Sequence, residues 1–218
     1  MGRSGTSYIA SALHASGFCM GDSLKPSDDR NEAGYYEDLE ILQLHESWLA
    51  EVDWDFGTVS DRFPLEPTTS MLDAVAAIVA NREARGRPWG AKPPGVLFFW
   101  PAWRTALPAS TVLLLPFRHP EAVARSYVAV GDTRERALAL WLQLNMLALD
   151  AIDEGPFEGV VIDFDRPEHV ARRLSEIVGY RIADTYRPDL HHHRGEEPLR
   201  GEIGALYAEL RRRANAPD

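Results

Sequence analysis

The segment that decides the fold runs from Thr111 to Pro120 and reads TVLLLPFRHP. Its first seven residues are mostly β-branched or leucine, the composition of a strand that is buried on both faces of a parallel sheet. Pro120 stands where a proline starts a helix. A buried strand that passes directly into a helix is typical of α/β proteins, in which helices alternate with parallel strands.

The same alternation extends along the rest of the chain. Periodicity and capping signals predict helices over residues 6–16, 35–51, 70–85, 134–154, 167–178 and 199–213, and short apolar runs predict strands over 17–21, 87–92, 111–117 and 159–164. The 218 residues contain no internal repeat and no low-complexity linker. We therefore expect a single domain, 1–218, with a three-layer α/β/α architecture around a central parallel sheet.

The composition excludes several classes of protein. The net charge is −10, and the segment 22–61, with 12 acidic and two basic residues, carries all of it. Neither a uniformly acidic protein nor a basic nucleic-acid binder fits this distribution. No apolar run approaches the roughly 20 residues of a membrane span. The single cysteine, Cys19, and the lack of an apolar leader predict a cytoplasmic protein.

The segment 2–7, GRSGTS, leads directly into the first predicted helix. Glycines let backbone N–H groups approach an anion closely, and the helix N-terminus adds its dipole. The hydroxyl groups add donors, and Arg3 adds a fixed charge with bidentate geometry. The segment predicts a cradle for a phosphate or sulfate group. It is not a Walker A motif, because the terminal Gly-Lys-Ser/Thr is absent.

Two further cationic residues stand at predicted strand ends. Arg118 follows the buried strand, and Ser126 lies eight residues later in the next helix. Ligands of open α/β sheets bind at the carboxyl ends of strands, so Arg118 is expected to face an anion. Lys92 ends the strand predicted over 87–92. It is one of only two lysines among 23 basic residues, the other being Lys25.

Together these segments resemble the bacterial type of sulfotransferases that use 3′-phosphoadenosine 5′-phosphosulfate (PAPS). The resemblance covers nearly the whole chain, including the segments Gly34–Asp38 and 159–164. It implies a P-loop NTPase-like sulfotransferase fold. Members have a buried strand before the anion loop, whereas here the loop begins at Gly2. We therefore expect a fold without its usual first strand, because the chain is truncated or because another segment replaces that strand.

The resemblance also implies the function and the site. The chain would transfer a sulfuryl group from PAPS, without a metal, to a hydroxyl or amine of a small-molecule or carbohydrate acceptor. Glu37 is the first choice for the base, with Asp38 and His45 as alternatives, and Lys92 and Arg3 would stabilise charge on the transferring group. The residues implied to bind the 5′-phosphosulfate are Arg3, Ser4, Gly5, Thr6 and Ser7, and those implied to bind the 3′-phosphate are Arg118 and Ser126.

Two other functions stay open at this point. Asp163 ends an apolar run as a Walker B aspartate does, which is the signal for a small-molecule kinase using ATP and Mg²⁺. The missing first strand is compatible with a non-catalytic nucleotide-binding protein. Family members often have Lys-Asp-Pro-Arg where this chain has the segment 92–95, KPPG, so one acidic and one basic side chain are absent there.

Two remaining features receive structural interpretations. The consecutive histidines 191–193 are expected to form a loop rather than a metal site, because consecutive side chains of a regular element do not converge on one ion. Arg194 beside them is a candidate contact of the nucleotide. The acidic segment 22–61 is expected to form acceptor-side surface and to disfavour anionic acceptors.

Overall fold

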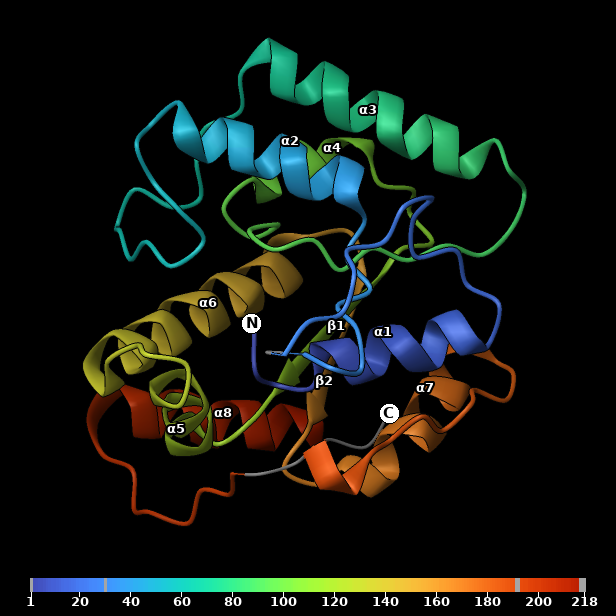
Figure 1. Ribbon diagram of the computed structural model, residues 1–218. Coiled ribbons are helices and arrows are strands. Elements are labelled where there is room, and N and C mark those ends of the chain that lie inside the picture. The colour runs from blue at the N-terminus through green and yellow to red at the C-terminus, as the bar shows by residue number, and fades with distance from the viewer. Residues whose placement is uncertain (1, 30, 191–192, 216–218) are drawn as a thin grey trace.

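Two parallel strands, β1 (Val112–Phe117) and β2 (Glu158–Asp163), lie at the centre of the computed structural model (Figure 1). Helices α5 (Pro120–Val128) and α6 (Arg134–Glu154) connect them, because parallel neighbours require a long crossover. The pairing runs in register, so both strands end at the same edge of the sheet. The structure describes residues 2–29, 31–190 and 193–215.

Helices cover both faces of this sheet. On one face lie α1 (Thr6–Ala15) and α7 (Val170–Val178), and on the other lie α5, α6 and α8 (Gly201–Ala214) (Figure 1). Leu114 and Leu115, neighbours in β1, pack against opposite helical layers. The continuous apolar run of β1 is explained by this burial, since successive side chains of a strand point to opposite faces.

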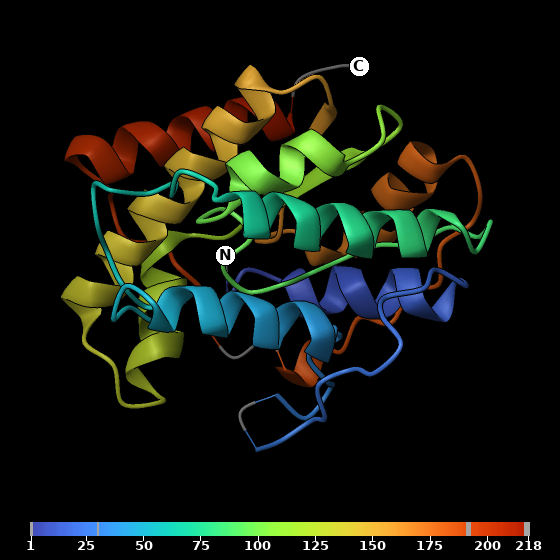
Figure 2. The ribbon, with the colours of Figure 1, turned by 90° about the horizontal axis from the view of Figure 1, so that it is seen from above.

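A separate group of helices, α2 (Leu39–Ala50), α3 (Thr69–Glu83) and α4 (Trp100–Ala106), gathers at one end of the molecule (Figures 1 and 2). The core between them is aromatic and includes the buried Trp48 and Trp103. Helix α4 was not among the predicted helices. Two short 3₁₀ helices, η1 (Pro167–His169) and η2 (Pro188–Leu190), complete the described elements.

The ends of several helices follow from the caps that the sequence supplies. Helix α6 has the predicted bounds, and Pro120 stands at the first position of α5 as predicted. The helix predicted over 35–51 begins only at Leu39, because the carboxylate of Asp38 accepts the backbone N–H of Glu40. Helix α3 begins one residue before the predicted start, and the hydroxyl of Thr68 caps it by accepting the backbone N–H of Met71.

The strands predicted over 17–21 and 87–92 meet, although they form no ladder. A single parallel bridge joins Cys19 to Trp89, with the Cys19 N–H donating to Pro88 O at 2.9 Å and the Gly90 N–H donating to Cys19 O at 3.0 Å. Pro88 and Gly90 of this second segment limit the pairing, because proline cannot donate to a ladder and glycine weakens a strand.

The mixed α/β class is confirmed, but the hydrogen-bonded sheet contains two strands among the described residues. Within that same part of the chain, no helix has the length and apolar character needed to cross a bilayer.

A buried arginine joins α3 to the start of α2. Arg82 has only 3% of its side chain exposed and forms ion pairs with Asp22, Glu40 and the equally buried Asp38. Its neighbour Arg85 also pairs with Asp22, but at the surface. Removing one partner of a buried pair leaves an uncompensated charge, whereas exposed pairs contribute little.

We predict that Arg82→Met lowers the free energy of unfolding by about 3–5 kcal/mol, because the Asp38 carboxylate is left buried without its partner. The matched surface variant Arg85→Met should lower that free energy far less, because its ion pair with Asp22 is exposed to solvent. Urea denaturation of both variants measures the difference. Equal losses would contradict the role assigned to burial.

Candidate functional site

The segment that was predicted to bind an anion forms a tight turn ahead of α1. Gly5 stands at the N-cap with φ of 84°, in the left-handed region, and no side chain caps the helix. A Cβ at Gly5 would lie 2.3 Å from the ring of Phe164, so only glycine fits. The N-terminus of α1 is thereby held against the end of β2 without a side-chain cap. Uncapped N–H groups at a helix N-terminus are suited to an anion.

The remaining residues of this turn also carry binding groups. Ser4 is fully buried, and its Oγ has no hydrogen-bond partner within the described ranges. Burial raises the pKa values of Tyr35 and Tyr127, and the positive charge of Arg3 opposes both shifts, which places Arg3 near both phenols. A Cβ at Gly2 would lie 3.0 Å from the Tyr127 hydroxyl oxygen. Tyr127 follows Ser126 in α5, so the predicted anion loop adjoins the helix that carries the second predicted segment.

Arg118 emerges from the carboxyl end of β1 and is 6% exposed. Its Nε and Nη2 have no hydrogen-bond partner among the residues that the structure describes. Burial lowers the pKa of Arg118, and the negative charge of Asp165 opposes that shift. A buried guanidinium with unsatisfied donors is costly, and an anion would satisfy it. This is the clearest signal for an anionic ligand in the described chain.

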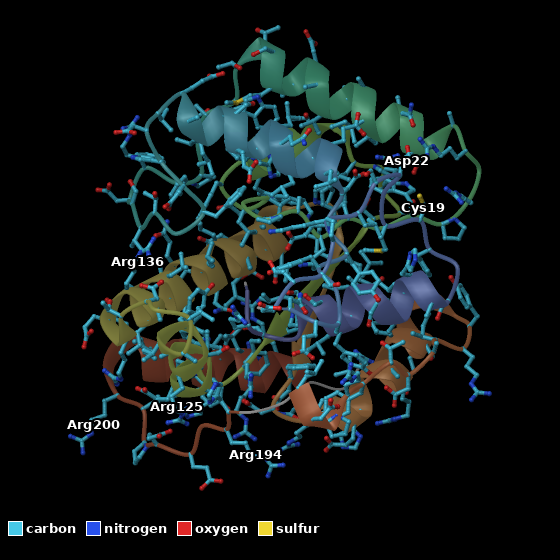
Figure 3. All side chains as sticks on the ribbon, in the orientation of Figure 1. Cys19, Asp22, Arg125, Arg136, Arg194 and Arg200 are labelled. Atoms are coloured by element: carbon cyan, nitrogen blue, oxygen red, sulfur yellow. The ribbon has the colours of Figure 1, made fainter. Side chains whose placement is uncertain are left out.

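A cavity of about 460 Å³ opens at the same edge of the sheet and is lined in part by Asp165, Tyr186 and Arg194. Burial raises the pKa of Tyr186, and the positive charges of Arg118 and Arg194 oppose that shift. Arg125 of α5 donates to the carbonyl of Arg194, and Figure 3 shows the two arginines at the same end of the molecule. Among the described residues, the lining contains one cation, Arg194, and three carboxylates, Asp165, Glu168 and Glu196. Arg118 lies near Tyr186 of this lining, since its charge acts on the phenol.

The cavity residues are fixed by contacts that the sequence did not reveal. Asp165 accepts the backbone N–H of His119 at 3.0 Å and the hydroxyl of Tyr207 at 2.8 Å. A Cβ at Gly195 would lie 2.0 Å from His119 Nδ1, so the segment after Arg194 lies directly on the strand end. His191 and His192 lie outside the described residues. Among those described, no group of His, Cys, Asp and Glu could hold a metal ion.

Glu37 and Lys92, which are 55 positions apart, meet in a half-buried ion pair. Lys92 Nζ lies 2.7 Å from Glu37 Oε1. Burial lowers the pKa of Lys92, and the charge of Glu37 opposes that shift. Lys25, which the sequence analysis noted only for its rarity, approaches the other oxygen, with Nζ 3.8 Å from Glu37 Oε2. The structure thus brings two predicted site residues together and adds a third.

Asp38 and His45, the two alternative candidates for the base, are already engaged in structural contacts. His45 is fully buried, with Nδ1 2.7 Å from Pro94 O and Nε2 accepting the indole N–H of Trp103 at 2.9 Å. These partners require the proton on Nδ1 and leave no free lone pair. Asp38 caps α2 and pairs with Arg82. Of the three candidates for the base, Glu37 has an oxygen without a hydrogen-bond partner in the described chain.

Asp163, the residue that suggested a kinase, makes contacts within the turn at the end of β2. Asp163 Oδ1 accepts the backbone N–H of Asp165 at 2.9 Å, and Oδ2 lies 3.9 Å from Arg166 Nε. Burial raises the pKa of Asp163, and the hydrogen bond from Asp165 opposes that shift. In this arrangement Asp163 shapes the turn that positions the cavity residue Asp165.

Comparison of the chain with protein families, with curated proteins and with solved structures finds no match. The function is therefore inferred from the geometry of the loop 2–7, of Arg118 and of the Glu37 cluster, which consists of Glu37, Lys92 and Lys25.

The buried ring of His45 makes a testable contribution to stability. Burial lowers its pKa from 6.5 to about 4. As the pH falls through this range, the unfolded chain binds a proton before the folded chain does, so stability falls. Between pH 7 and pH 5 we expect His45 to remove about 2 kcal/mol from the free energy of unfolding. Urea denaturation of wild type and His45→Gln at both pH values measures this contribution.

From pH 7 to pH 5, the free energy of unfolding of the wild type should fall by about 2 kcal/mol relative to that of His45→Gln. A difference between the two proteins that stays constant with pH would contradict the neutral, buried histidine.

Proposed function

We propose that the protein is a PAPS-dependent sulfotransferase that acts on a hydroxyl or amine of a small-molecule or carbohydrate acceptor. The observation that carries the proposal is the buried guanidinium of Arg118, which has unsatisfied donors at the end of β1 and lies near Tyr186 of the cavity lining. PAPS has anions at both ends of its ribose. A second anion-binding element, the turn before α1, lies against the end of the neighbouring strand.

In this proposal the two elements hold the two ends of the donor. The turn 2–7 binds the 5′-phosphosulfate, and Arg118 with Ser126 binds the 3′-phosphate. The cavity beside Tyr186 takes the adenosine. The helical layers on both faces of the sheet support a P-loop NTPase-like sulfotransferase fold with three layers, which we include in the proposal.

The Glu37 cluster supplies the chemistry. Sulfuryl transfer resembles phosphoryl transfer in that an in-line displacement needs positioning and charge stabilisation more than covalent catalysis. The acceptor oxygen attacks sulfur, its proton passes to Glu37, and the bond from sulfur to the bridging phosphate oxygen breaks. Lys92 and Arg3 offset the charge that builds on the sulfonate and the leaving phosphate. The products are the sulfated acceptor and 3′-phosphoadenosine 5′-phosphate.

Binding of 3′-phosphoadenosine 5′-phosphate tests the assignment of Arg118. Isothermal titration calorimetry should show that Arg118→Ala weakens binding by about 1.5–3 kcal/mol, the range for a charged hydrogen-bond partner, or roughly 10- to 160-fold. Arg172→Ala is the control, because Arg172 is 71% exposed on α7 and pairs with Glu176. That variant should bind as the wild type does.

No binding by folded wild type would refute the sulfotransferase. Tighter binding of ATP with Mg²⁺ than of the 3′-phosphorylated nucleotide would favour the kinase. An unchanged affinity of Arg118→Ala would refute the 3′-phosphate site alone.

Transfer of radioactive sulfate from PAPS to a panel of acceptors tests the base. Glu37→Gln should reduce kcat by about 10²–10⁴-fold, because general-base catalysis contributes that much, while nucleotide affinity stays unchanged. Glu46→Gln, on the exposed side of α2, is the control and should retain activity. Full turnover by Glu37→Gln would contradict the assignment. Nucleotide binding by wild type without transfer to any acceptor would favour a non-catalytic protein.

A further inference from the structure

Both lysines of this chain contact the same carboxylate. Arginine provides 21 of the 23 basic residues, yet the two cations at Glu37 are Lys25 and Lys92. Their geometries differ. Lys92 forms a hydrogen bond of 2.7 Å to Oε1, whereas Lys25 lies 3.8 Å from Oε2, beyond hydrogen-bond distance. Lys92 is held by Glu37, while Lys25 is attracted to it without a fixed bond.

The backbone holds the base of Lys25 beside Glu37. The Lys25 N–H donates to Glu37 O at 2.8 Å, and an antiparallel bridge joins Leu24 to Asp38. The side chain itself is less restrained, with 35% exposure against 18% for Lys92. Its ammonium lies 4.1 Å from the centre of the Tyr35 ring. A long side chain on a fixed backbone can change partners without any rearrangement of the fold.

Lys25 also lies at the oxygen that the proposed reaction needs. Glu37 Oε2 is buried and has no hydrogen-bond partner among the described residues. A base must come within hydrogen-bond distance of the proton that it accepts. Since Oε1 is already bound to Lys92, the acceptor has to reach Oε2. The nearby ammonium of Lys25 must move for that contact to form.

The charges around Lys25 favour an anion. At least four of the twelve carboxylates of the acidic segment pair with arginines: Asp22, Asp38 and Glu40 with Arg82, and Asp55 with Arg136. The groups that face Lys25 are Glu37 and the ring of Tyr35, whose hydroxyl donates to the exposed Asp28 at 2.7 Å. Lys92 binds the other oxygen of Glu37. Two ammonium groups share one carboxylate, so this cluster has an excess of positive charge.

We infer that Lys25 binds an anionic group of the acceptor and, in leaving Glu37, exposes the oxygen that removes the acceptor's proton. The inference rests on the proposed function and specifies the acceptor as one that carries a carboxylate near the reacting hydroxyl. A ligand can separate Lys25 from Glu37 only if it binds the separated state better than the paired state. A carboxylate does so because it replaces Glu37 as the partner of the ammonium, and a neutral acceptor provides no such replacement.

The presence of only two lysines permits a direct test by NMR. Protein labelled with ¹³C at the lysine Cε carbon gives two lysine signals, which Lys25→Met and Lys92→Met assign. The wild type, saturated with 3′-phosphoadenosine 5′-phosphate, is titrated with two matched pairs of probes. The pairs are methyl glucuronide with methyl glucoside, and 4-hydroxybenzoate with 4-hydroxybenzyl alcohol.

The expected result is a saturable shift of the Lys25 signal with at least one carboxylate probe, at least tenfold tighter than with its neutral partner. In Glu37→Gln the carboxylate should bind more tightly than in wild type, because Lys25 has lost its competing partner. Lys25→Arg should retain the preference for the carboxylate, and Lys25→Met should abolish it. These binding measurements need no turnover.

Several outcomes would overturn the inference. They are a Lys25 signal that ignores both carboxylates, equal affinity for charged and neutral probes, and a preference that survives Lys25→Met. A shift caused by PAPS but not by 3′-phosphoadenosine 5′-phosphate would assign Lys25 to the donor's sulfonate instead of to the acceptor. Failure of the nucleotide itself to bind is seen separately, before any probe is added, and refutes the proposed function.

Discussion

The contact between Phe164 and Gly5 is the constraint on which the candidate site depends. Phe164 follows β2 directly, and its N–H donates to Phe117 O at 2.9 Å, so the pairing of the two strands fixes its position. The ring then occupies the space that a side chain at residue 5 would need. The turn before α1 consequently rests on the edge of the sheet from which Arg118 also emerges. Two strands are enough to bring both candidate anion-binding elements together.

The parts of the fold that could be predicted are those that local sequence determines. The 21 residues of α6 form one periodic helix with a cap at Thr133, and the bounds expected for it match those observed. The start of α2 depends on Asp38, whose role as a cap was not recognised. The segments around Cys19 and Trp89 have the composition of strands, but pairing depends on the partner, and Pro88 and Gly90 restrict it to one bridge.

The same limit applies to the candidate site. The sequence indicates which residues are candidates, but it does not show which partners they contact. The family resemblance implied Glu37 and Lys92 as separate candidates, yet no local pattern indicates that residues 55 positions apart form one ion pair. His45 lies close to Glu37 in the sequence and was a reasonable candidate for the base. Its role is set by Trp103 and by the carbonyl of Pro94, which occupy both ring nitrogens. Only the tertiary packing around a titratable group shows whether it is available for chemistry.

The contacts of its carboxylates in the structure change the interpretation of the acidic segment 22–61. Its charge suggested a surface that repels anions, but Asp22, Asp38 and Glu40 surround Arg82 and join α3 to the start of α2. Coulomb interactions are strongest within a few ångströms and are screened beyond about 8 Å in physiological salt. The charge that an incoming group meets is therefore set by its immediate neighbours. At Glu37 those neighbours are two ammonium groups, so a segment that is acidic overall contains a local site with an excess of positive charge.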